Sequence, residues 1–79
     1  GDFKSQQYSD LVKVLTGQSY EPEVIAKIMP VIIALPADYV ARIIHRNHSY
    51  TRIRAALLEQ KGIEELMIWD QKIQQKINS

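Results

Sequence analysis

A chain of 79 residues has room for one domain with a modest core, and a hydrophobic content of 46% argues against disorder. The net charge is only +1, so nucleic-acid binding would require basic residues gathered on one face. The absence of cysteine excludes disulfides, thiolate metal ligands and cysteine nucleophiles. We expect a single domain over residues 1–79 in the cytoplasm or nucleus. Gly1 fits the first residue of an excised or trimmed chain.

The first predicted helix covers residues 5–16. Its apolar side chains recur at i, i+3, i+4 and i+7, which predicts one buried face. This face consists of Tyr8, Leu11, Val12 and Leu15. Ser5 or Ser9 would cap the start of the helix, and Gly17 would end it.

The second predicted helix opens at Pro22, because proline suits the first helical turn. Its inward residues are Val24, Ile25, Ile28 and Met29. Pro30 lacks the N–H that would bond to the carbonyl of Ala26, so we expect a break or kink near Met29. Residues 31–35 are apolar on every side and predict a short buried helix or a kinked continuation. This apolar run is too short to cross a membrane.

A third helix is predicted over residues 37–46, after another proline that marks a helix start. Its inward face consists of Tyr39, Val40, Ile43 and Ile44, and its outward face carries Arg42, His45 and Arg46. Residues 47–49 form the break that follows. Asn47 or Ser49 would cap a fourth helix that reaches about Gln60.

The rest of the chain has two further apolar faces, one on each of the last two predicted helices. The fourth helix turns Tyr50, Ile53 and Leu57 inward, and the last helix, over residues 63–77, does so with Leu66, Trp69, Ile73 and Ile77. Gly62 separates the two helices. We therefore predict an all-α fold, a compact orthogonal bundle of four to five short helices in which sequence neighbours pack together.

The basic residues gather in one segment. All four arginines lie between Arg42 and Arg54, and no acid lies between Asp38 and Glu59. The candidate residues for binding a partner or nucleic acid are Arg42, Arg46, His48, Ser49, Thr51, Arg52 and Arg54. Asp38 can offset Arg42 one helical turn away. Arg46 has no such local acid, so a negative ligand or a carboxylate from another helix would have to supply one.

The helix, break and helix around this segment resemble a helix-turn-helix pair. Its second helix would enter the major groove of DNA, with residues 49–54 at the base edges and Arg42 and Arg46 at the phosphates. Free N–H groups at the start of that helix would add partial positive charge. The small residue and the glycine usual in such a turn are absent, which weakens this interpretation.

Catalytic and metal chemistry find little support. His45 and His48 have a spacing that can place two imidazoles on one helix face, but zinc needs three or four ligands. Ser49 lacks the strand and glycine-flanked turn that hold a nucleophile, and the chain has no glycine-rich phosphate loop. We therefore expect no enzyme, no cofactor and no metal site.

Met67 and Ile68 lie off the inward stripe of the last helix and form a candidate partner patch. Our first hypothesis is a non-catalytic helical interaction or assembly module with a basic patch at residues 42–54 and a regulatory role. Its partner would be another protein, or the chain itself as a homodimer through the last helix, and not a membrane. The alternative is a helix-turn-helix domain that binds DNA.

Overall fold

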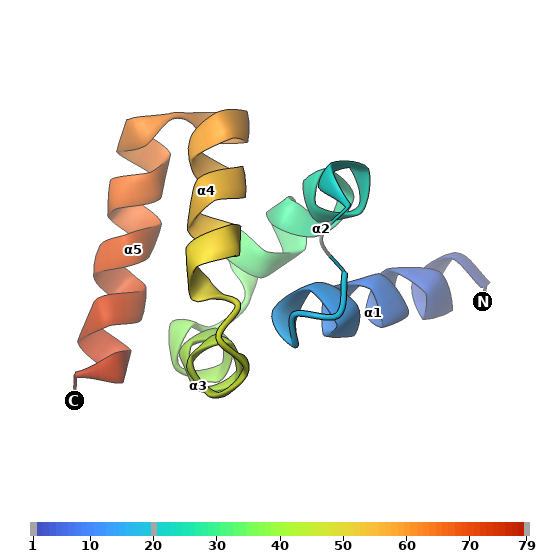
Figure 1. Cartoon of the computed structure of the whole chain (residues 1–79), viewed down its shortest axis with the longest axis horizontal. Helices are drawn as coiled ribbons and strands as arrows, with labels where there is room; N and C mark the ends of the chain where they lie inside the picture. Colours follow the sequence, from blue (N-terminus) through green and yellow to red (C-terminus); the bar gives the residue numbers. More distant parts are fainter. Residues whose placement is uncertain (1, 20, 79) are drawn as a thin grey trace.

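The computed structural model describes residues 2–19 and 21–78, so Gly1 lies outside the described part. Within these ranges the regular secondary structure consists of five α-helices, joined by short links, and contains no strand. The helices are α1 (Asp2–Leu15), α2 (Pro22–Ala34), α3 (Ala37–Asn47), α4 (Tyr50–Lys61) and α5 (Ile63–Ile77) (Figure 1). This confirms the predicted all-α class. None of these helices combines the length and the apolar character needed to cross a membrane.

The helices are arranged at steep angles to one another. In Figure 1, α4 and α5 run antiparallel side by side, α1 runs crosswise to their right, and α3 is seen end-on below them. The α5 helix packs against α3 and α4, α1 packs against α2 and α3, and α2 packs against α4. Sequence neighbours do not all pack together as expected. No comparably extensive contact joins α3 to α2 or α4 in the described ranges, because the links at residues 35–36 and 48–49 turn the chain sharply.

The core lies where these helices meet. Its buried apolar side chains are Val14, Leu15, Ile25, Ile28, Met29, Ile32, Val40, Ala41, Ile44, Ile53, Leu57, Leu66, Trp69 and Ile73. The core residues that α4 and α5 contribute all belong to the inward faces predicted for these two helices. Burial of these side chains removes apolar surface from water and is the main stabilising contribution.

The α1 helix differs most from its prediction. It begins at Asp2, ahead of the predicted start at Ser5, and its inward side is rotated. Val14 and Leu15 are buried, whereas Tyr8 is 67% exposed. The predicted apolar face of α1 is therefore only partly covered. The reason is that α1 lies at the edge of the bundle and makes extensive contacts only with α2 and α3.

Pro30 does not end its helix. The α2 helix continues through it to Ala34, so of the expected break or kink near Met29 the break is wrong, and residues 31–34 continue the same helix. Pro30 and Ala26 both lie on the exposed side of α2. Because proline has no N–H, the Ala26 carbonyl lacks its usual hydrogen-bond donor in the helix. Water can take the place of that donor on the exposed side, which lowers the free-energy cost of the missing hydrogen bond.

Left-handed residues end α1 and α3. Gly17 has φ 76° and His48 has φ 57°. In each case the N–H of the following residue bonds to the carbonyl five positions earlier, at 2.7 Å in α1 and 3.2 Å in α3. Gly17 is confirmed as a helix terminator. His48 makes the same turn with a side chain, which costs about 1 kcal/mol relative to glycine.

Candidate protein-binding groove between α1 and α3

Ser49 belongs to the interior of the protein. Its side chain is 2% exposed, and its hydroxyl donates a hydrogen bond of 2.6 Å to the carbonyl oxygen of Leu15. Ser49 stands at the N-cap position of α4, but its side chain makes no capping bond there. The hydroxyl instead ties the turn before α4 to the end of α1. Ser49 is therefore not available to a partner or to a base edge.

Arg54 is held by the last helix. Its Nε donates a hydrogen bond of 3.1 Å to Oδ1 of Asp70, and the hydroxyl of Tyr50 donates to the same oxygen. The Gln74 amide donates to the Tyr50 hydroxyl at 2.9 Å. The Tyr50 ring also packs on Trp69, with ring centroids 6.0 Å apart. These contacts form the α4–α5 cluster, which joins the two helices. The Arg54 guanidinium is therefore engaged by another residue of the same chain.

Three other predicted binding residues lie at the surface of the turn and of α4. His48, Thr51 and Arg52 are exposed. Arg52 borders a wide depression of about 540 Å³ between α2 and α4, whose lining also includes Glu23 and Glu59. Charges of both signs therefore surround Arg52, and this part of the surface has no strong preference for an anion.

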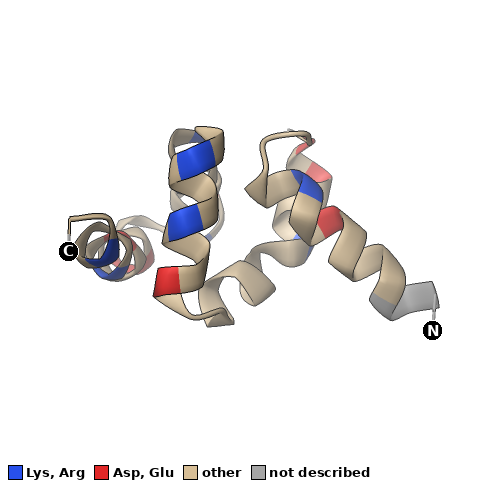
Figure 2. Ribbon diagram, turned by 90° about the horizontal axis from the view of Figure 1, so that it is seen from below, with Lys and Arg blue, Asp and Glu red and all other residues tan. Residues whose placement is uncertain are grey.

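Arg42 and Arg46 have a different environment. Both are exposed on α3, and neither makes a hydrogen bond or an ion pair with any residue in 2–19 or 21–78. Asp38 does not come within ion-pair distance of Arg42, although the helical spacing allows it. In the view from below, basic positions follow one another along the outer side of α3 (Figure 2). Two like charges thus lie one turn apart without a compensating carboxylate.

A groove of about 270 Å³ runs between α1 and α3 beside these arginines. Its lining consists of Tyr8, Leu11, Val12, Leu15 and Thr16 from α1, and Tyr39, Arg42, Ile43, Arg46 and Asn47 from α3. Four of the α1 residues are the stripe that the sequence assigned to the core. Leu15 of this stripe is buried in the core as predicted, whereas Tyr8, Leu11 and Val12 stay at least partly exposed along one wall of the groove, which we call the α1–α3 groove.

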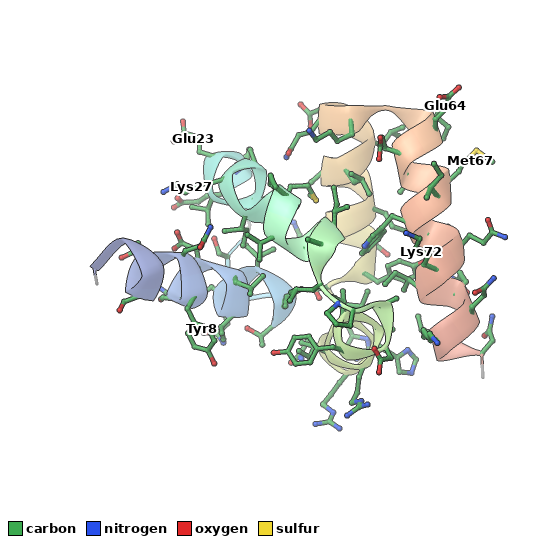
Figure 3. All side chains as sticks on the ribbon, turned by 180° about the vertical axis from the view of Figure 1, so that it is seen from behind. Tyr8, Glu23, Lys27, Glu64, Met67 and Lys72 are labelled. Atoms are coloured by element: carbon green, nitrogen blue, oxygen red, sulfur yellow. The ribbon has the colours of Figure 1, made fainter. Side chains whose placement is uncertain are left out.

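The rim of the α1–α3 groove is exposed. Tyr8 is 67% exposed and Tyr39 is 47% exposed. Figure 3 shows Tyr8 on the side of α1 that points away from α2. Tyrosine and arginine are the residue types that protein interfaces favour, because each joins a large apolar surface to a polar end. An apolar side chain can fill the groove while carboxylates pair with Arg42 and Arg46.

The predicted patch on α5 lies elsewhere. Met67 is 64% exposed and Ile68 is 56% exposed, and Ile63 and Leu58 near them are also exposed. Met67 and Glu64 project outward from α5 (Figure 3). The α4–α5 turn lies at the top of Figure 1, whereas α1 and α3, which line the groove, lie in its lower part. The two predicted surfaces are therefore separate.

The described ranges contain no group of three or more His, Cys, Asp or Glu residues arranged to hold a metal ion. His45 is exposed on the outer side of α3. No protein-family model matches the chain, and neither a curated protein nor a solved structure matches it. The α1–α3 groove is therefore the feature of this protein that points to a function.

Proposed function

We propose that the protein is a non-catalytic interaction module whose α1–α3 groove binds an acidic, apolar segment of a partner protein. The observation that carries this proposal is the coincidence of an apolar groove, two exposed tyrosines and two arginines that make no ion pair within the described part of the chain. A helix with apolar side chains at i and i+3 or i+4, flanked by glutamate or aspartate, has the chemistry to fill it.

The stripe on α1 supports the proposal. Leu11 and Val12 have the helical spacing of core residues, yet both stay partly exposed beside the groove. Their burial by a partner would remove apolar surface from water at about 25 cal/mol per Å². A partner segment would complete a layer that α1 and α3 leave open.

The two arginines add selectivity for an acidic segment. Arg42 and Arg46 repel each other one turn apart, which costs α3 a few tenths of a kcal/mol. A carboxylate that pairs with either arginine relieves this repulsion. Charge complementarity of this kind raises the association rate and discriminates between partners.

The helix-turn-helix alternative has less support. Of the residues expected at base edges, Ser49 is buried and Arg54 is bound to Asp70. Thr51 and Arg52 stay exposed at the start of α4, but Ala55 and Leu58 farther along its exposed side have no hydrogen-bonding groups to read base edges. Arg42 and Arg46 suit a phosphate as well as a carboxylate, so the test includes DNA.

The test is an NMR titration of the ¹⁵N-labelled protein with an acidic amphipathic peptide built from leucine and glutamate. We expect amide shifts that concentrate on α1 and α3, and an Arg46→Glu variant should bind at least about tenfold more weakly. Lys72→Glu makes the same charge reversal on α5, outside the groove, and should bind like the unmodified protein.

A parallel titration uses a mixed-sequence DNA duplex at low salt. Salt-sensitive DNA binding, together with no peptide-induced shifts at Leu11, Val12 or Tyr39, would show that the proposal is wrong and would favour the helix-turn-helix alternative.

A further inference from the structure

The exposed large hydrophobic side chains fall into two groups. In the described ranges, Tyr8 and Tyr39 border the α1–α3 groove, and the remaining four lie around the α4–α5 turn. Those four are Leu58 (44% exposed), Ile63 (56%), Met67 (64%) and Ile68 (56%). Together with Glu64 they form a surface that we call the α4–α5 tip. Apolar side chains gathered at two separate places indicate two binding surfaces.

The α4–α5 tip has the arrangement expected of the segment that the groove would bind. Ile63 and Met67 lie one helical turn apart on α5, and Glu64 lies between Met67 and Ile68 around the helix. Glu64 makes no ion pair with any part of the chain that the structure describes. Glu59 and Glu65 add further negative charge near the turn, and Lys61 at the end of α4 offsets one of these charges. The tip thus joins apolar side chains to a net negative charge, whereas the groove joins apolar side chains to a positive charge.

We propose that the α4–α5 tip of one copy docks in the α1–α3 groove of a second copy. This inference rests on the proposed function and identifies the partner as the chain itself. The contact places apolar residues such as Met67 against the groove wall and brings Glu64 to Arg42 and Arg46. Both groups of exposed hydrophobic side chains are covered by the same contact.

The charges favour a head-to-tail contact over a two-fold dimer. In a two-fold dimer that uses either surface alone, that surface meets its own copy across the axis. Groove against groove would bring Arg46 next to a second Arg46, and tip against tip would do the same for Glu64. A head-to-tail contact instead joins opposite charges, so it is preferred over the homodimer through the last helix that the sequence suggested.

A head-to-tail contact also leaves one groove and one tip free at the ends of every assembly. The α4–α5 turn and the helices α1 and α3 lie on opposite sides of the view in Figure 1, so further copies can add. Heterologous contacts of this kind give rings or open filaments. The average mass should therefore rise with concentration beyond that of a dimer.

The test uses two variants that each block one surface. Arg46→Glu reverses a charge in the groove, and Met67→Lys places a cation on the tip that faces the arginines. Both positions are exposed, so the variants should fold, which circular dichroism checks. In sedimentation velocity up to millimolar concentration, the unmodified chain should self-associate and each variant alone should do so at least about tenfold more weakly.

Mixing the two variants is the decisive measurement. The intact groove of Met67→Lys can bind the intact tip of Arg46→Glu, so the mixture should associate at concentrations at which neither variant does so alone. Gln75→Lys adds the same charge as Met67→Lys to an exposed site near the other end of α5 and should assemble normally. Weaker assembly of the unmodified chain in about 1 M salt, where the Debye length is about 3 Å, would further support charge pairing.

Several outcomes would overturn the inference. A mixture that stays monomeric, or an unmodified chain that stops at a dimer, would exclude head-to-tail assembly. If the unmodified chain stays monomeric but its groove binds the acidic peptide, only the self-assembly is wrong and the proposed function stands. If it neither assembles nor binds the peptide, both are wrong.

Discussion

The two ends of the basic segment have opposite environments. Arg54, on α4, donates to Asp70 and lies over the Tyr50 ring, with 5.8 Å between the Arg54 Cζ atom and the ring centroid. Arg42 and Arg46, on α3, have no such partners in residues 2–19 and 21–78. The same residue type thus serves the stability of the bundle at one end and remains open to a ligand at the other.

The position of α5 explains the difference. It places Asp70 and Gln74 beside the start of α4, where they accept and donate hydrogen bonds. It also packs against α3, where its residues Lys76 and Ile77 line a depression beside Arg42 and offer that arginine no carboxylate. A cluster of arginines in a sequence is therefore not yet a binding site, because packing decides which of its members have partners.

The largest loss of stability should come from the α4–α5 cluster. Asp70→Ala removes the acceptor that Tyr50 and Arg54 share, and charged hydrogen bonds of this kind contribute about 2 kcal/mol together. The estimate allows for solvent, because the Arg54 side chain is 42% exposed. Urea unfolding, followed by the fluorescence of Trp69, measures the change.

Asp38→Ala is the matched control for Asp70→Ala. Asp38 is exposed on α3 and makes no hydrogen bond or ion pair within the described ranges, so its replacement should change the free energy of unfolding by less than about 0.5 kcal/mol. Equal losses for the two variants would contradict the assigned role of Asp70. Asp70→Asn keeps an acceptor oxygen and should fall between them.

The second largest loss is expected at Ser49. Ser49→Ala removes a buried hydrogen bond of 2.6 Å and leaves the Leu15 carbonyl without the hydroxyl that it accepts from. The expected cost is about 1.5 kcal/mol. Thr51→Ala changes an exposed hydroxyl nearby and should cost less than about 0.5 kcal/mol in the same unfolding experiment. A loss at Thr51 as large as at Ser49 would show that the buried bond is not the cause.

Local patterns predicted the helices well. Gly62 has φ 94°, which glycine adopts readily, and α5 runs from Ile63 to Ile77 as its apolar stripe predicts. The break expected at Pro30 was wrong because the rule against proline inside a helix does not consider which side of the helix the proline occupies. Its exposed position lets water reach the carbonyl that it leaves unpaired. Helical spacing is a property of neighbouring residues, so the sequence carries it directly.

The candidate site was less accessible from sequence because it depends on contacts between distant segments. Tyr8 shares a stripe with Leu15, and only the placement of α3 decides that Leu15 is buried while Tyr8 borders a groove. The Ser49 hydroxyl bonds to a residue 34 positions away. One signal was present in the sequence, namely the long apolar stripe of α1. When such a helix lies at the edge of a small bundle, its neighbours cannot cover the whole stripe, and part of it stays open.

His48 connects the two ends of the basic segment and should give a gain in stability. Its φ of 57° is a conformation that glycine adopts without strain, so His48→Gly should stabilise the folded state by up to about 1 kcal/mol. Gly17→Ala makes the reverse change at the end of α1 and should destabilise by about 1 kcal/mol. His48 does not line the groove, so peptide binding should not change. A weaker affinity would show that this residue contributes to the site.

The smallest effect on stability should come from the two groove arginines. Replacing both Arg42 and Arg46 with glutamine removes a like-charge pair and no internal bond, so the free energy of unfolding should rise by at most about 0.5 kcal/mol. The same double variant should lose most of its affinity for the acidic peptide. Stability and binding would then separate at α3, whereas Arg54→Gln should weaken the fold and spare the groove. A double variant that unfolds more easily would mean that α3 uses these arginines for the fold, as α4 uses Arg54.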